Sequence, residues 1–174
     1  MYYFKRIPFF MVFFLMIIAT PRIVQADERT AVQQYNALVK LSYEMPEDID
    51  FELLRKLFTQ QPDYNPYKMN PIEEFKIINK IEGRNPEEAR EMLDEYLRKM
   101  FALFEAHSRA ALIYQRHNKL EKAEYHEWMA DGLTDALLNS GDGFEADTAY
   151  YVVSFSEESF ILEPYLEKKE PDVN

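Results

Sequence analysis

FEAHSRAALIYQRHNKLEKAEYHEWMADGLTDALLN, residues 104–139, is the stretch that decides the fold. It places small residues and one aromatic residue where tetratricopeptide repeats have them, at Ala111, Tyr114, Ala123 and Ala130. Small side chains let two antiparallel helices approach closely, and the aromatic ring fills the seam between them. The stretch therefore predicts two helices, 104–117 and 120–139, joined by a tight turn at Asn118.

Upstream of this hairpin, apolar residues recur at helical spacing in four further segments, 28–43, 51–58, 71–81 and 86–99. Asp50 is a suitable N-terminal cap, and Asn85-Pro86 combines a cap with proline at the first helical position. Ala89 precedes Ala123 by 34 residues, which is the tetratricopeptide period, although this first unit matches the repeat less well. We predict a mainly α fold with tetratricopeptide-like antiparallel hairpins over 70–139, capped by the N-terminal helices.

The end of the chain has a different composition. Ser140–Gly143 is typical of a helix stop followed by a turn, and YYVVSF at 150–155 has the β-branched and aromatic content of a short strand. Residues 163–174 are charged, and we expect them to form a disordered tail. A single helical domain is thus predicted to cover 27–162, with a short C-terminal β segment.

The N-terminus has the three parts of a secretory signal peptide. The pair Lys5-Arg6 is the positive region, residues 7–19 are uncharged and largely apolar, and Val24 and Ala26 are small residues before a cleavage point. The apolar run is shorter than the roughly 20 residues of a spanning helix, and an uncleaved anchor is the alternative. We predict that the signal peptide 1–26 is cleaved after Ala26, which leaves a periplasmic or secreted protein with no stable membrane anchor.

Charge and composition exclude several classes of function. The formal net charge of −11 becomes −14 when the signal peptide is removed, because it takes away three basic residues and no acidic one. Because this net negative charge repels phosphate, we expect no nucleic acid as a partner. We favour a protein or peptide partner, particularly a basic one. The chain has no cysteine, which excludes disulfides, thiolate catalysis and sulfur-ligated metals.

Four segments taken together resemble a known family: LRKLFTQQPDYNPY (54–67), EAHSRAALIY (105–114), KAEYHEWMADGL (122–133) and SGDGFEADTAYYVVSFSEE (140–158). They are similar to domain of unknown function 4919, an uncharacterised bacterial family found largely in exported proteins of Gram-negative bacteria. The resemblance covers most of 50–162. It implies an exported protein and carries over no activity, cofactor or site residue.

His107 and His126 are the candidate metal-binding or catalytic residues. On the predicted hairpin their imidazoles are offset by about one helical turn, or roughly 6 Å. Two side chains at that separation can share a metal ion. A catalytic zinc, however, usually has three protein ligands, and the spacing fixes no third one. We therefore expect two histidines hydrogen-bonded and partly buried at a helix seam, with no catalytic residue and no cofactor.

Tyr64, Tyr67 and Trp128 are the candidate partner-binding residues. The two tyrosines lie in the proline-rich connector 60–71, where a stiff loop can offer aromatic contact area at low entropic cost. The structural alternative is that both rings fold back into the groove between helices. Carboxylate pairs such as Glu157-Glu158 are predicted to lie on a solvated face.

The predicted function is a non-enzymatic, extracytoplasmic interaction module that binds a protein or peptide partner on the surface of stacked helical hairpins. The alternative is a small metal-binding protein or hydrolase that uses His107 and His126. A structural envelope component without a discrete ligand is a third possibility.

Overall fold

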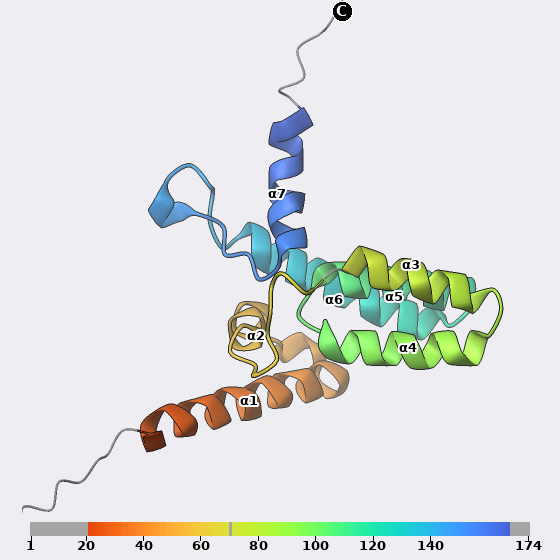
Figure 1. The fold of residues 1–174 in the computed structure, drawn as a ribbon, viewed down its shortest axis with the longest axis horizontal. Coiled ribbons are helices and arrows are strands. Elements are labelled where there is room, and N and C mark those ends of the chain that lie inside the picture. The colour runs from red at the N-terminus through yellow and green to blue at the C-terminus, as the bar shows by residue number, and fades with distance from the viewer. Residues whose placement is uncertain (1–20, 70, 168–174) are drawn as a thin grey trace, which may run out of the picture.

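The chain forms seven α-helices in the part that the computed structural model describes, residues 21–69 and 71–167 (Figure 1). In order these are α1 (Pro21–Glu44), α2 (Phe51–Phe58), α3 (Pro71–Glu82), α4 (Pro86–Lys99), α5 (Phe104–Arg116), α6 (Leu120–Leu138) and α7 (Phe155–Glu167). Two short 3-10 turns, η1 (Pro46–Asp48) and η2 (Ala146–Thr148), lie in the connections. The prediction of a mainly α fold is confirmed.

The helix starts that were predicted from capping residues are confirmed. The Asp50 carboxylate accepts a hydrogen bond of 2.9 Å from the backbone N–H of Leu53, so it satisfies one of the free donors in the first turn of α2. Asn85 does the same for α4 through the N–H of Glu88, at 3.4 Å. Pro86 follows it at the start of the helix, where its missing N–H costs nothing.

The stretch 104–139 folds as the predicted antiparallel hairpin, with α5 packed along α6. Its turn is at Asn118, which has a positive φ of 58°, a conformation that asparagine tolerates better than most residues. Ala111, Ala123 and Ala130 are all buried, as is Tyr114. Helices α3 and α4 form a second antiparallel pair that lies beside the first (Figure 1).

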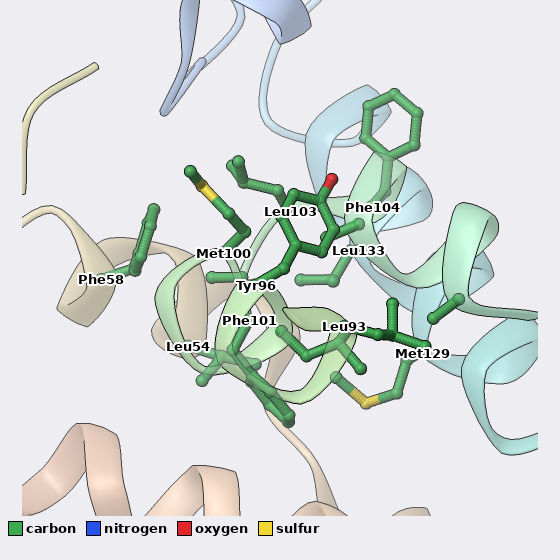
Figure 2. Packing of buried hydrophobic residues seen from close by; sticks show 14 of the residues in the cluster. Leu54, Phe58, Leu93, Tyr96, Met100, Phe101, Leu103, Phe104, Met129 and Leu133 are labelled. Atoms are coloured by element: carbon green, nitrogen blue, oxygen red, sulfur yellow. The ribbon is translucent and has the colours of Figure 1, made fainter. Parts of the chain in front are cut away.

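Helix α2 packs against α6 at a point where α6 has no side chain. A Cβ atom added at Gly132 would lie 2.3 Å from the ring of Phe51, so only glycine permits this approach. The main core lies between α2, α4, α5 and α6 (Figure 2) and includes Leu54, Leu93, Met129 and Leu133, each at most 1% exposed.

The linker between α4 and α5 is itself part of the core. Residues 100–103 are all buried, although they belong to neither helix. Buried backbone groups need hydrogen-bond partners. The N–H of Leu103 finds one in the carbonyl of Met100, at 3.0 Å, and the carbonyl of Phe101 finds one in a histidine described below.

The predicted strand at 150–155 is wrong, because no β-strand occurs in the described residues. This segment runs without regular structure into α7, and side chains rather than a neighbouring strand satisfy its backbone. The N–H of Tyr151 donates to the Ser140 hydroxyl at 2.8 Å, and the N–H of Val153 donates to the Glu157 carboxylate at 2.8 Å. β-branched and aromatic residues favour an extended backbone, but a strand also requires a partner strand.

Helix α7 continues to Glu167, so residues 163–167 of the predicted disordered tail are helical. Residues 168–174 lie outside the described part of the chain, as do residues 1–20 of the predicted signal peptide. The predicted cleavage point after Ala26 falls within α1. No helix among the described residues is long and apolar enough to cross a membrane.

Candidate functional site

A groove of about 860 Å³ lies between α1, α4 and the α5–α6 hairpin and is here called the central groove. Helix α1 contributes one face, with Tyr35, Asn36 and Val39 at helical spacing. Its remaining aromatic lining residues are Tyr43, Phe101, Tyr114 and Tyr125. An apolar, aromatic hollow with a few polar groups is the usual form of a ligand-binding site.

The rings along the central groove contact one another in a continuous series. Tyr43 stacks on Tyr125 with ring centroids 5.0 Å apart, and Tyr125 meets His126 edge-on at the same distance. Tyr114 stacks on the other side of His126 at 5.3 Å and 10°. The Tyr125 hydroxyl also lies 2.9 Å from the hydroxyl of Ser42, which ties α6 to α1. These contacts fix the shape of the groove floor.

His126 and His107 meet within the α5–α6 seam, closer than the predicted offset of one helical turn. Their Nδ1 atoms are 2.9 Å apart, and Nε2 of His107 lies 2.8 Å from the carbonyl oxygen of Phe101. His107 is fully buried and His126 is 5% exposed. The expectation of hydrogen-bonded histidines at a helix seam is confirmed, but both are buried rather than partly buried as predicted. His107 supplies the partner that the buried Phe101 carbonyl requires.

Both imidazoles are held in the neutral form. Burial, together with the neighbouring His126, lowers the pKa of His107 from 6.5 to about 3, although the hydrogen bond to Phe101 acts in the opposite direction. Burial and the nearby Lys122 ammonium lower the pKa of His126 to about 4. Three of the four ring nitrogens in question are engaged with a partner or with each other. Within the described residues, no set of three metal-ligating side chains gathers at this pair or elsewhere.

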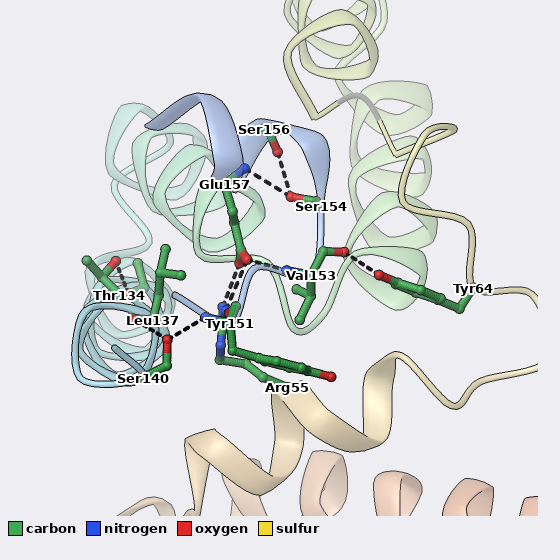
Figure 3. Close-up of polar contacts among 11 residues, drawn as sticks. Arg55, Tyr64, Thr134, Leu137, Ser140, Tyr151, Val153, Ser154, Ser156 and Glu157 are labelled. Carbon is green, nitrogen blue, oxygen red and sulfur yellow. Dashed lines mark hydrogen bonds and ion pairs between the residues drawn. The ribbon is translucent and has the colours of Figure 1, made fainter. Parts of the chain in front are cut away.

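The partner-binding candidates Tyr64 and Tyr67 have separate environments. A second hollow of about 530 Å³, here called the connector hollow, is lined by Tyr64 and by neighbouring residues of the 60–69 connector. Tyr64 folds back: its ring meets Phe58 edge-on at 5.6 Å, and its hydroxyl donates to the carbonyl of Val153 at 2.9 Å (Figure 3). Tyr67 is 87% exposed. The two rings therefore do not act as one surface.

Trp128 is a packing residue at the α2–α6 contact. Its ring is partly buried, 5.2 Å from the ring of Phe51 and 6.0 Å from that of Tyr125. It does not line either hollow. Trp128 thus packs against Tyr125, which lines the central groove, and the structure does not bring Trp128 together with Tyr64 or Tyr67.

The two hollows adjoin one another. Tyr35, Asn36 and Arg98 line both of them, so the central groove continues along α1 and α4 to the connector. The Tyr35 hydroxyl at this junction is buried and makes no hydrogen bond within the described part of the chain. Sequence reasoning missed these residues because its candidate binding residues lay only in the connector and on the helix 120–139. The apolar and aromatic stripe of α1 is the signal that could have found them.

A buried ion pair joins α2 to the start of α7, and sequence reasoning missed it as well (Figure 3). The Arg55 guanidinium donates to both carboxylate oxygens of Glu157, at 2.6 and 3.0 Å, and to the carbonyl of Tyr151 at 2.6 Å. Neither charged side chain is more than 1% exposed. The prediction that Glu157-Glu158 lies on a solvated face is therefore wrong for Glu157, whose carboxylate is paired inside the fold.

The central groove has no net formal charge, in contrast to the chain as a whole. Its charged lining residues are Asp94, Arg98, Glu121 and Lys122. The Lys122 ammonium lies 5.1 Å from the centroid of the Tyr114 ring, a cation–π contact within the molecule. A ligand would thus meet rings, a neutral imidazole and balanced charges.

Comparison with family models, with curated proteins and with solved structures finds no match for this chain.

Proposed function

We propose that this chain is a non-enzymatic interaction module that works outside the cytoplasm and binds an extended peptide segment of a partner protein in the central groove. The observation that carries the proposal is the continuity of the two hollows, which share Tyr35, Asn36 and Arg98. An extended chain needs a long open track, and the groove with its connector hollow offers one between α1 and α4. Tyrosine rings supply contact area at low entropic cost.

We also propose a fold type and a family for this chain. The pairs α3–α4 and α5–α6 are tetratricopeptide-like hairpins, supported by the buried alanines of the second pair, and the chain is a member of domain of unknown function 4919, supported by the four segments quoted above. Stacked hairpins of this kind present concave surfaces to extended partners. The negative charge of the whole chain steers a basic partner toward it.

The alternative function, metal binding or hydrolysis through His107 and His126, has less support. Their Nδ1 atoms face one another, and Nε2 of His107 faces a backbone carbonyl, so one nitrogen of the pair is left for a ligand. A metal assay on purified protein tests this alternative directly. Stoichiometric metal that disappears in His126→Ala would favour it over the interaction module.

The test of the interaction module is a comparison of two variants on α1. Asn36→Trp fills the junction of the two hollows, whereas Gln33→Trp adds the same ring at an exposed position of α1 that lines neither hollow. Binding to an array of synthetic peptides of mixed sequence is measured for both. We expect Asn36→Trp to weaken the retained peptides by about tenfold or more, equivalent to ~1.4 kcal/mol, and Gln33→Trp to bind as wild type. Equal binding by the two variants would remove the groove from consideration.

The proposed compartment has its own test. The full chain is expressed in a Gram-negative host, and the periplasmic fraction is examined by N-terminal sequencing. The expected product begins at Asp27, because the predicted signal peptide ends at Ala26. Protein that stays in the cytoplasm with its first residues intact would contradict the proposal.

A further inference from the structure

The hydrogen bonds of the two histidines determine where their protons lie. A carbonyl oxygen can only accept, so Nε2 of His107, 2.8 Å from the Phe101 oxygen, carries the hydrogen. Nδ1 of the neutral His107 ring is then an acceptor, and Nδ1 of His126, 2.9 Å away, must be the donor. His126 therefore has its proton on Nδ1, and its Nε2 carries a lone pair.

The His126 ring is also fixed in orientation. Tyr114 covers one face at 5.3 Å, Tyr125 meets it edge-on at 5.0 Å, and His107 holds the Nδ1 edge. His126 lines the central groove, and its Nε2 is not among the fully buried polar atoms that lack a partner in the described residues, so it remains accessible. Within the described residues no side chain or backbone group donates to this Nε2. The groove floor thus presents one fixed hydrogen-bond acceptor between aromatic rings.

A second polar atom in the groove has no partner. The Tyr35 hydroxyl is buried, its residue is 7% exposed, and it makes no hydrogen bond within the described part of the chain. Buried hydroxyls without a partner are uncommon in folded proteins. Because this oxygen is closed off from solvent, a bound chain could bond it only after the Tyr35 ring turned toward the junction of the two hollows.

The charges near His126 argue against a cationic side chain at this position. The Lys122 ammonium already lies over the Tyr114 ring that stacks on the imidazole. A second cation would have to displace the Lys122 ammonium or lie close to it, and like charges repel. An uncharged O–H or N–H can donate to the imidazole without this cost. A carboxylate offers no donor to Nε2.

We propose that the central groove selects a peptide residue with an uncharged hydrogen-bond donor, which donates to Nε2 of His126. The expected residues are serine, threonine, tyrosine, tryptophan, asparagine and glutamine. This inference rests on the proposed function, because it names what the same groove recognises. The basic character of a partner then acts through long-range attraction, outside this one position.

The test uses an oriented library of synthetic peptides with one randomised position, applied to wild type, His126→Phe and Lys122→Met. Wild type should enrich donor-bearing residues over size-matched apolar ones by about fivefold, the change that one neutral hydrogen bond gives. His126→Phe keeps the ring stack and should lose this preference while it still retains peptides. Lys122→Met should raise the enrichment of lysine and arginine.

A spectroscopic measurement on wild type keeps the inference testable even if His126→Phe fails to fold. The ¹⁵N spectrum of the histidine rings should show His126 protonated on Nδ1 and bare on Nε2, and His107 protonated on Nε2. The reverse assignment for His126 would overturn the inference without any peptide. Selection of lysine or arginine by wild type would do the same.

The outcomes separate this inference from the function on which it rests. Peptides that wild type retains without preference at the randomised position would leave the interaction module standing and refute the role of His126. If none of the three proteins retains any peptide, the proposed function fails and this specificity fails with it.

Discussion

Replacement of Arg55 by methionine should be among the most damaging single substitutions in this protein, because it leaves the Glu157 carboxylate buried without its cation. Removal of one partner of a buried ion pair costs about 3–5 kcal/mol. The Tyr151 carbonyl also loses its 2.6 Å hydrogen bond, which adds about 1–3 kcal/mol if that group stays buried. We expect Arg55→Met to lower the free energy of unfolding by at least about 4 kcal/mol, a large share of the ~5–15 kcal/mol of a typical domain.

The assay is urea denaturation followed by far-ultraviolet circular dichroism, with a control on the same helix. Lys56 is the next residue of α2, and its pair with Glu52 is exposed, so Lys56→Met should leave the urea midpoint close to that of wild type. Hydrogen exchange should show the loss of protection in α7 first, since Arg55 joins α7 to α2. Equal urea midpoints for the two methionine variants would refute the reasoning.

A double variant separates the charge from the backbone contacts. Arg55→Met/Glu157→Leu removes both buried charges, and such replacements are often neutral or stabilising elsewhere. Here the N–H of Val153 and the carbonyl of Tyr151 would still lose their partners. The double variant should therefore recover part of the stability lost in Arg55→Met and remain below wild type. Full recovery would mean that the two backbone groups reach water or other partners.

Three further predictions concern the core and the connector. The pKa values of His107 and His126 in the folded chain are lowered to about 3 and 4, so as the pH falls these residues bind protons in the unfolded chain before they do so in the folded one. The free energy of unfolding is therefore unaffected by them above pH ~6.5 and is lower by about 2 kcal/mol per histidine at pH ~5. Urea titrations at both pH values should show this decrease as the difference between wild type and a His107→Gln/His126→Gln variant, because the other groups, including the buried Glu105 with its pKa raised to about 7, titrate alike in both proteins. Gly132→Ala should lower the melting temperature through overpacking of about 1–3 kcal/mol, although alanine normally stabilises a helix interior by about 1 kcal/mol; a raised melting temperature would show that the neighbouring ring moves away freely. Tyr64→Phe should lose about 1 kcal/mol with its hydrogen bond, whereas Tyr67→Phe, at an exposed position, should unfold as wild type does in the same urea experiment.

The helices were predictable because their determinants are local. Caps at Asp50 and Asn85 and the alanine spacing of the hairpin each act within one or two turns, and the structure places helix starts and the α5–α6 turn where these residues predict them. The same local logic was available for α7. Ser154 and Glu157 have the Ser-x-x-Glu spacing of a helix start, and the Glu157 N–H does donate to the Ser154 hydroxyl at 3.2 Å. The β-branched composition of 150–155 obscured it.

The candidate site was less predictable because it depends on contacts between distant segments. Tyr35 and Arg98 line one groove only after α1 has packed on α2 and so lies across the groove from α4. Arg55 resembles any basic residue of an amphipathic helix, and its partner lies 102 residues further along the chain. The position of the histidine pair at the helix seam was predicted correctly, but the distance between the two rings was not. Residue spacing determines only where the two backbones lie, and the side-chain rotamers bring the Nδ1 atoms to 2.9 Å.

Hydrogen bonds and ion pairs between helices explain how a chain without cysteine can hold its helices in one packing arrangement, although their apolar faces could pack in several. Arg55–Glu157 joins α2 to α7, His107–His126 joins α5 to α6, and Ser42–Tyr125 joins α1 to α6. Apolar stripes tolerate a shift in register, but a shift here would leave buried charges and hydroxyls unpaired, each at a cost of about 1–3 kcal/mol or more. The Ser42–Tyr125 bond and the adjoining tyrosine stack hold α1 at one edge of the central groove. The width of that groove, and with it the surface proposed to bind peptides, therefore depends on these polar contacts as much as on the core beneath them.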